Sequence, residues 1–131
     1  MPSKVEYSTP DNTMSPVGPY SHIAKVGQFI TIGATAGVDP ATGDLAGDDI
    51  ESQTKQILDA FDVMLGSVGS DLDHIIHINV FLADMRDFDR MNAAYVEKMG
   101  ERRPARTAIS VSGLPKPGAL LTMNLTAVTK G

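Results

Sequence analysis

The chain has 131 residues, of which 42% are hydrophobic and only 5% aromatic, so we expect one domain over residues 1–131 with an aliphatic core. Its net charge of -5 argues against nucleic acid or an anionic membrane as a partner. The absence of cysteine excludes disulfides, thiolate nucleophiles and cysteine metal sites, and the polar first residues and lack of a long apolar run predict a cytoplasmic protein without a membrane span.

The first half of the chain is predicted to contain a hairpin, a loop and a helix. β-forming residues predict two short strands within residues 22–32, with a turn near Gly27. Four glycines, two aspartates and a proline predict an irregular loop over residues 33–47. Asp48 has an acid three residues after it, as in a helix N-cap, and apolar residues then recur at helical spacing. We expect this helix to be closed by Gly69.

The second half is predicted to contain three strands and one more helix. Apolar and polar residues alternate over residues 76–82, as in a strand with one buried face. A helical apolar stripe follows over residues 88–99. Strands are expected over residues 106–111 and 120–128, on either side of a loop rich in Pro and Gly. The order β-β-α-β-α-β-β predicts an α+β fold, in which two helices cover one face of a single mixed sheet.

The other face of this sheet is predicted to be semi-polar. If Ile109 and Val111 point at the helices, then Arg106, Ala108 and Ser110 point away from them. The same alternation adds polar and aromatic residues of two other strands, namely Thr122, Asn124 and Thr126 with His77, Asn79 and Phe81. A face of this mixed composition suits a subunit contact or a site between subunits.

Arg106 is the residue with the clearest chemical implication. It stands at the start of a predicted strand, two residues after Pro104. A guanidinium is a planar fork of donors that matches a carboxylate with two parallel hydrogen bonds, so Arg106 is a candidate carboxylate clamp. The competing interpretation is a solvated or surface-paired arginine, because most arginines are exposed.

Arg106 is accompanied by five further motifs spread along the chain. They are Gly18-Pro19-Tyr20, Gly37-Val38-Asp39-Pro40, Thr42-Gly43, the helical pair Asn92 and Tyr95, and Leu114-Pro115-Lys116. In this order and spacing the chain resembles the RidA/YjgF/YER057c/UK114 family over about residues 7–128. The resemblance implies a chorismate-mutase-like fold that assembles into a homotrimer with a central barrel, with sites in the three clefts between subunits.

The resemblance also implies an activity. Members of this family hydrolyse reactive 2-imino acids and their 2-enamino tautomers to 2-keto acids and ammonia, without a cofactor. The protein must hold the substrate carboxylate, place a water near the imine carbon and manage one proton. By resemblance Arg106 binds the carboxylate and Tyr20 lines the cleft. The remaining candidate substrate contacts are Gly33, Ala34, Thr35 and Ala108.

Two positions depart from the pattern of the family's active deaminases. Gly33 replaces a cleft-wall serine, so only Thr35 can supply a hydroxyl there. On the last strand Asn124 stands where those deaminases have a glutamate that orients or activates water. An amide can position water but cannot take a proton, and loss of a general base lowers rates by about 10²–10⁴. A roomier cleft with one carboxylate fewer predicts a larger or dicarboxylic substrate.

The other polar candidates have structural interpretations. Asn92 and Tyr95 share a helix face with apolar residues, which predicts a supporting role through packing and hydrogen bonds. His74 and His77 are three apart, and residues at this spacing on a strand face opposite sides. No carboxylate or thiolate completes a convergent ligand set with them, so no metal site is predicted.

Three functions are considered, of which the first two agree best with the sequence. The first is a homotrimeric imine/enamine deaminase in which Arg106 holds the carboxylate, Tyr20 lines the cleft and Asn124 positions water. The second is a non-catalytic trimer that binds a small carboxylate metabolite in the same clefts. The third is a protein-level role, either as a holdase for unfolded proteins or on RNA. The net charge argues against RNA, whose phosphates demand a basic surface.

Overall fold

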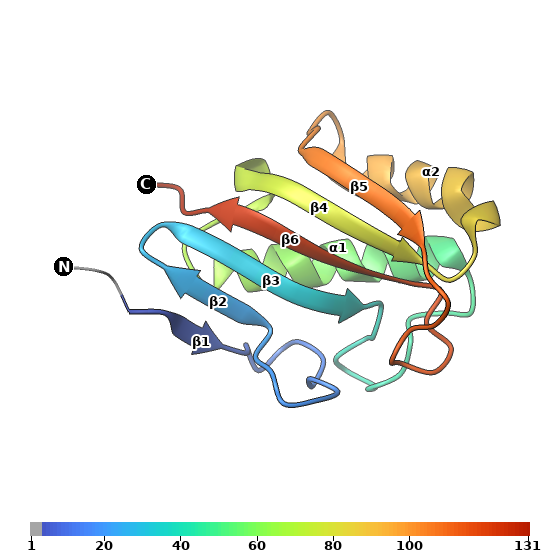
Figure 1. Ribbon diagram of the computed structural model, residues 1–131, viewed down its shortest axis with the longest axis horizontal. Coiled ribbons are helices and arrows are strands. Elements are labelled where there is room, and N and C mark those ends of the chain that lie inside the picture. Colours follow the sequence, from blue (N-terminus) through green and yellow to red (C-terminus); the bar gives the residue numbers. More distant parts are fainter. Residues whose placement is uncertain (1–3) are drawn as a thin grey trace.

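Six strands form one mixed sheet in the computed structural model, which describes residues 4–131 (Figure 1). The strands are β1 (Glu6–Ser8), β2 (Ile23–Val26), β3 (Phe29–Ala36), β4 (Ile75–Leu82), β5 (Ala105–Ser110) and β6 (Leu121–Val128). The helices are α1 (Ile50–Gly66) and α2 (Phe88–Met99), and two 3₁₀ turns, η1 (Leu72–His74) and η2 (Met85–Asp87), precede β4 and α2. The sheet order is β1-β2-β3-β6-β4-β5, in which only β4 and β5 pair in parallel.

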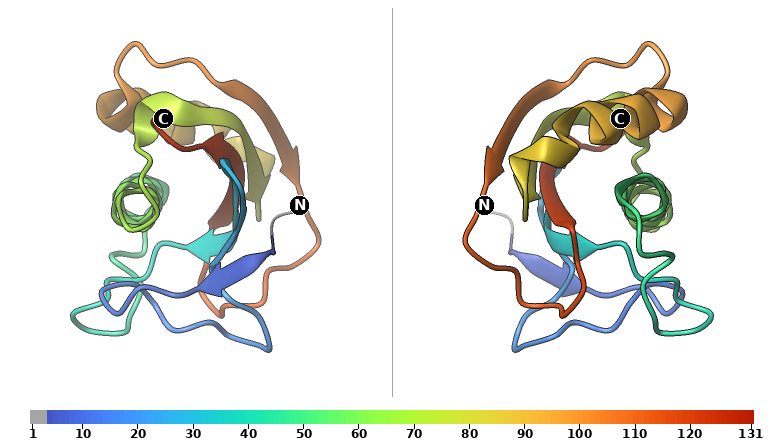
Figure 2. Two further views of the ribbon diagram at one scale, coloured as in Figure 1. Left: turned by 90° about the vertical axis from the view of Figure 1, so that its left-hand side faces the viewer. Right: turned by 90° about the vertical axis from the view of Figure 1, so that its right-hand side faces the viewer.

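Both helices lie on the same side of the sheet (Figure 2). The core lies between the helices and the sheet. It is built from aliphatic side chains with methionines and a single fully buried phenylalanine, Phe61. The predicted α+β class, with one mixed sheet and two helices on one face, is confirmed. No helix among residues 4–131 is both long and apolar enough to cross a membrane.

The hairpin, the two helices and the three later strands are found, but β3 continues to Ala36, four residues into the segment predicted as an irregular loop. The sequence patterns missed β1, a three-residue edge strand whose side chains are all exposed and therefore show no buried face. The helix cap was also predicted one residue early: the carboxylate of Asp49, not Asp48, accepts the Ser52 N–H at 2.8 Å. Helix α1 ends at Gly66, and Gly69 follows it with a positive φ of 77°.

Gln53 ties helix α1 to the loops that flank the sheet. It is fully buried, and its Nε2 donates to the carbonyl oxygens of Gly47 at 2.9 Å and Gly118 at 3.3 Å. Its Oε1 accepts the Leu120 N–H at 2.8 Å. One side chain therefore anchors the loop between β5 and β6 at the point where β6 begins.

The predicted orientation of β5 was wrong for Arg106 and Ala108. The register with β4 pairs Arg106 with Ile78 and Ala108 with Val80, two residues that are fully buried on the helix side. Ala108 accordingly packs against the core, while Ile109 is 45% exposed. Since β5 is an edge strand, its apolar residues do not identify the covered face, and Ile109 lies instead on the face away from the helices.

On β4 and β6 the predicted semi-polar face is confirmed. Asn79 is paired with Asn124 and donates from Nδ2 to its Oδ1 at 2.8 Å. The His77 imidazole Nε2 lies 3.1 Å from the Thr107 hydroxyl of β5. The opposite side of β6, formed by Leu121, Met123 and Leu125, is buried against the helices.

Candidate functional site

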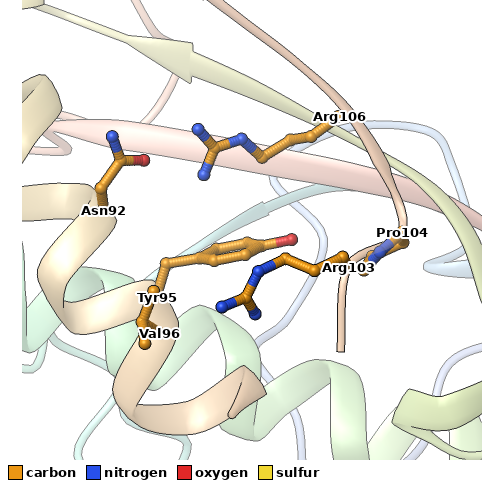
Figure 3. A pocket seen from close by; sticks show the side chains of 6 residues that line it. All are labelled: Asn92, Tyr95, Val96, Arg103, Pro104 and Arg106. Atoms are coloured by element: carbon orange, nitrogen blue, oxygen red, sulfur yellow. The ribbon is translucent and has the colours of Figure 1, made fainter. Parts of the chain in front are cut away.

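A cavity of about 260 Å³ lies between helix α2 and the start of β5 (Figure 3). We call it the arginine pocket; its lining residues are Asn92, Tyr95, Val96, Arg103, Pro104 and Arg106. The helix contributes the first three, the segment before β5 contributes Arg103 and Pro104, and β5 itself contributes Arg106. The sequence motif around Arg106 and the helical pair Asn92 and Tyr95 therefore meet at one site.

The Arg106 guanidinium is held over aromatic rings. Its Cζ lies 4.8 Å from the centroid of the Tyr95 ring and 5.8 Å from that of Phe88. Cation–π contacts of this kind orient a guanidinium without using its N–H donors. No carboxylate of residues 4–131 forms an ion pair with Arg106, so its donors remain free for a ligand anion.

Asn92 and Tyr95 present unsatisfied polar atoms in the same pocket. Asn92 Oδ1 and the Tyr95 hydroxyl are buried and have no hydrogen-bond partner. Buried polar groups normally find a hydrogen-bond partner, so these two atoms are candidates for hydrogen bonds to a ligand. Burial raises the pKa of Tyr95, against the opposing effect of Arg106 and Arg103, so the phenol is neutral near pH 7 and is available as an O–H donor.

A second group of predicted residues gathers around Tyr20 at the end of β3. This smaller cavity of about 30 Å³, the tyrosine pocket, is lined by Met14, Val17, Tyr20, Ala34, Ala36, Pro115, Lys116 and Thr122. The Tyr20 hydroxyl accepts the Val17 N–H at 3.2 Å, and its ring stands edge-on to the buried His22 ring at 6.0 Å between centroids. Tyr20 and Ala34, both predicted to contact the substrate, therefore line the same small cavity.

A bulge in β3 determines which residues near Gly33 reach this pocket. The register with β6 shifts between Ile32 and Thr35, so successive residues no longer alternate regularly between faces. Thr35 is fully buried and donates its hydroxyl to the Gly33 carbonyl at 3.0 Å. Neither Gly33 nor Thr35 lines the tyrosine pocket, and Ala34 is the member of this run that does.

Thr122, not Asn124, is the β6 residue in the tyrosine pocket. The two residues share a face of β6, but Thr122 pairs with Ala36 of β3, whereas Asn124 lies farther along the strand and bonds to Asn79. Thr122 is almost completely buried and carries a hydroxyl. Asn124, the residue predicted to position water, is on the same face of β6 two residues after Thr122 and does not line this pocket.

Neither pocket contains a carboxylate among its lining residues. The arginine pocket holds two guanidiniums, and the tyrosine pocket holds the Lys116 ammonium. Within residues 4–131 no group of three or more His, Cys, Asp and Glu side chains is arranged to bind a metal ion. The arrangement favours binding of an anion and provides no side chain that is negatively charged at neutral pH to act as a general base.

The two pockets are far apart on one chain. Arg106 lies on β5, two strand-to-strand steps of about 4.8 Å from Thr122 on β6 and three steps from Ala34 on β3. Arg106 also points to the helix side of the sheet and Thr122 to the other side. Ala108, predicted as a substrate contact, packs against the core and lines neither pocket. A single chain does not bring Arg106 and Tyr20 onto one small molecule.

Sequence reasoning missed Arg103, Thr122 and Lys116 as pocket residues. Lys116 carried a signal, because Leu114-Pro115-Lys116 was among the motifs of the resemblance. Arg103 is adjacent to the Pro104 that marks the start of β5, but nothing in the local sequence distinguishes it from Arg102. Thr122 alternates on the same face as Asn124, and choosing between them requires the register with β3.

Comparison with known proteins gives consistent matches over most of the chain. The model of the family described as Endoribonuclease L-PSP matches residues 10–129, which include both helices and every strand except β1. A RutC family protein of Pyrococcus horikoshii is 42% identical over 106 residues, covering 81% of this chain and 84% of that protein. A 2-iminobutanoate/2-iminopropanoate deaminase of Bos taurus is 35% identical over 102 residues, covering 78% and 74%. The crystal structure of RidA from an Antarctic Psychrobacter species matches with a TM-score of 0.88 at 29% identity, over 94% of this chain and 98% of that chain.

Proposed function

Because the chain belongs to the Endoribonuclease L-PSP family, which is the RidA/YjgF family, we propose that it hydrolyses 2-imino acids to 2-keto acids and ammonia. The observation that carries the proposal is Arg106, a half-buried guanidinium that has no carboxylate partner among the described residues and lines a small cavity. A curated relative that covers 78% of this chain is named as an imino acid deaminase.

Arg106 has the geometry to hold the substrate carboxylate. A bidentate guanidinium–carboxylate pair sets both the position and the plane of the acid group. The neighbouring imine, protonated on nitrogen, is attacked by water at carbon; the resulting carbinolamine then expels ammonia and leaves the ketone. No redox change occurs, and water and the imine together contain every atom of the products, so the reaction requires no cofactor.

We propose that the complete site is formed by two copies of the chain. The arginine pocket of one subunit would face the tyrosine pocket of its neighbour, so that Arg106 and Tyr20 contact the same ligand from two sides. The separation of these pockets on one chain supports this arrangement. A homotrimer with three such clefts is the assembly that the family resemblance implies. Exposed apolar residues on the sheet face, such as Ile76, Phe29 and Ile109, are suited to the contact.

In this arrangement the water is positioned by Thr122 rather than by Asn124. Thr122 is in the tyrosine pocket, and its hydroxyl can both donate to and accept from a water. The Asn124 carbonyl oxygen is already engaged by Asn79. Since no lining residue of either pocket is a carboxylate, the water must lose its proton without a strong base, and we expect slow turnover.

The direct test supplies imines in solution. An amino acid oxidase releases 2-imino acids from a panel of small, aromatic and acidic amino acids, and semicarbazide traps what remains. We expect the purified protein to lower the rate of semicarbazone formation from at least one member of the panel. A rate equal to that in buffer for every amino acid would contradict deaminase activity.

A carboxylate introduced into the tyrosine pocket tests the assignment of Thr122. We expect Thr122→Glu to raise the rate of imine hydrolysis by about tenfold or more, because a general base typically contributes about 10²–10⁴. Asn124→Glu, on the same strand and face but outside the pocket, is the matched control and should change the rate by about twofold at most. If Asn124→Glu raised the rate in the semicarbazide assay and Thr122→Glu did not, Asn124 would be the residue that positions water.

A carboxylate-binding protein without catalysis is the second candidate. The lack of any carboxylate lining either pocket favours it, because the cationic groups that hold an anion are present while the proton-handling group is not. Binding of a small 2-keto acid with no effect on imine trapping would support this function. We do not propose RNA cleavage, since the net charge is -5 and three of the five arginines, Arg86, Arg90 and Arg102, are each paired with a carboxylate.

A further inference from the structure

The five arginines of the chain divide into two classes by their partners. Arg86, Arg90 and Arg102 form ion pairs with Asp84, Glu51 and Asp73, at N···O distances of 2.7, 2.7 and 2.6 Å. Among residues 4–131 no carboxylate pairs with either of the other two, Arg103 and Arg106. These two unpaired arginines are the two that line the arginine pocket.

Main-chain carbonyls hold the Arg103 side chain in place. Its Nη1 donates to the carbonyl oxygens of Gly100 at 2.6 Å and of Arg102 at 2.8 Å. Both bonds use the same nitrogen, so Nη2 and Nε remain available as donors. Gly100 is the residue directly after the end of helix α2, and a cation there is also favoured by the helix dipole. The charge of Arg103 is therefore anchored at the pocket without being neutralised.

Arg103 and Arg106 line the same cavity, the arginine pocket. In Figure 3 the Tyr95 ring lies between the two guanidiniums, and the side chains of Asn92 and Tyr95 complete that wall of the cavity. Both arginines act electrostatically on the Tyr95 phenol. Two cations and no carboxylate line this cavity of about 260 Å³, and a ligand with two anionic groups matches that charge.

We infer that Arg103 determines specificity by binding a second anionic group of the ligand, so that the site prefers dicarboxylic 2-imino and 2-keto acids over monocarboxylic ones. This inference rests on the proposed function for the role of Arg106, which holds the carboxylate next to the reacting carbon. The carboxylate at the far end of the ligand then meets the free donors of Arg103. The structural alternative is that Arg103 serves only to cap α2, which predicts an effect on stability and none on ligand preference.

The experiment measures binding and hydrolysis side by side in the parent and in Arg103→Gln. The binding probes are 2-oxoglutarate and 2-oxohexanoate, which are similar in length but differ in the second carboxylate, and calorimetry gives their dissociation constants. Hydrolysis is measured with imines from glutamate and norleucine in the semicarbazide assay. Arg102→Gln removes the same charge one residue away, outside the pocket, and is the matched control. Arg103→Lys keeps the charge, and thermal unfolding of each variant reports the contribution to stability.

We expect the parent to bind 2-oxoglutarate about tenfold more tightly than 2-oxohexanoate, as one added charge-assisted hydrogen-bonded contact allows. Arg103→Gln should abolish this preference, while Arg102→Gln should retain it and Arg103→Lys should retain part of it. An unchanged ratio in Arg103→Gln, with or without a lower melting temperature, would overturn the inference in favour of a capping role. If the parent hydrolyses no imine but Arg103→Gln still abolishes the preference for 2-oxoglutarate, the role of Arg103 in binding is upheld. The proposed deaminase activity is then contradicted.

Discussion

Replacing Arg106 by alanine is expected to lower kcat/KM for imine hydrolysis by about 100-fold. Each hydrogen bond to a charged group contributes about 1.5–3 kcal/mol, and the bidentate pair with the substrate carboxylate contains two such bonds. The fold should survive, because Arg106 contributes to stability mainly through its contacts with the Tyr95 and Phe88 rings. Contacts of this kind are worth about 0.5–1 kcal/mol each at exposed sites.

Two further variants separate the effect of the planar guanidinium of Arg106 from the effect of its positive charge. Arg106→Lys keeps the positive charge but cannot form the bidentate pair, so we expect a loss intermediate between those of alanine and the parent. Arg86→Ala removes an arginine that pairs only with Asp84 on the surface and should leave the kinetics unchanged. Equal loss in Arg86→Ala and Arg106→Ala would indicate a general effect of net charge. Full activity in Arg106→Ala would remove Arg106 from the site.

The split between kcat and KM carries additional information. An interaction made equally with substrate and transition state raises KM when it is lost and leaves kcat unchanged. Since the carboxylate does not change charge in the reaction, most of the Arg106 effect should appear in KM. A large fall in kcat would mean that Arg106 also orients the imine carbon toward the attacking water.

The elements that pattern alone predicted are those with one clearly buried face. Helices α1 and α2 and strand β4 bury long apolar stripes, so the helical and strand periodicities are visible in the local sequence. The edge strands lack this signal. β1 is exposed throughout, and β5 has Ile109 on the outer face and Arg106 on the helix side, which reversed its predicted orientation.

The site was predicted in its parts but not in its assembly. Arg106, Asn92 and Tyr95 line one pocket, and Tyr20 and Ala34 line another. The choice of Thr122 over Asn124 depends on pairing with a strand some 90 residues earlier in the chain, which no local pattern contains. The bulge between Ile32 and Thr35 likewise becomes visible only once β3 is aligned with β6.

The largest effect on stability is expected from Gly37→Ala. A Cβ built at Gly37 would lie 2.6 Å from the Gln53 carbonyl oxygen and 2.7 Å from the Gln53 Cα. Both atoms belong to the backbone of helix α1, so no side-chain rotation can remove the clash, and the helix must move away from the end of β3. We expect the free energy of unfolding to fall by about 3 kcal/mol, the upper range for overpacking a well-packed site.

Gly66→Ala is the matched control for this change. Gly66 is the last residue of α1, its φ is not positive, and nothing lies within 4 Å of its added Cβ. Alanine has the higher helix propensity, so this variant should be as stable as the parent or slightly more stable. Urea unfolding is compared at one fixed protein concentration, so that the result does not depend on whether the chain assembles. Equal stability of Gly37→Ala and the parent would contradict the close packing of α1 on β3.

The same variant links the packing of α1 to the site. Gln53 holds the carbonyl of Gly118 and the N–H of Leu120, so a displaced α1 also displaces the loop that carries Lys116 and the start of β6 that carries Thr122. At concentrations of urea where Gly37→Ala is still folded, ligand binding should therefore be weaker than in Gly66→Ala. Loss of stability with unchanged binding would show that the tyrosine pocket keeps its shape independently of the helix.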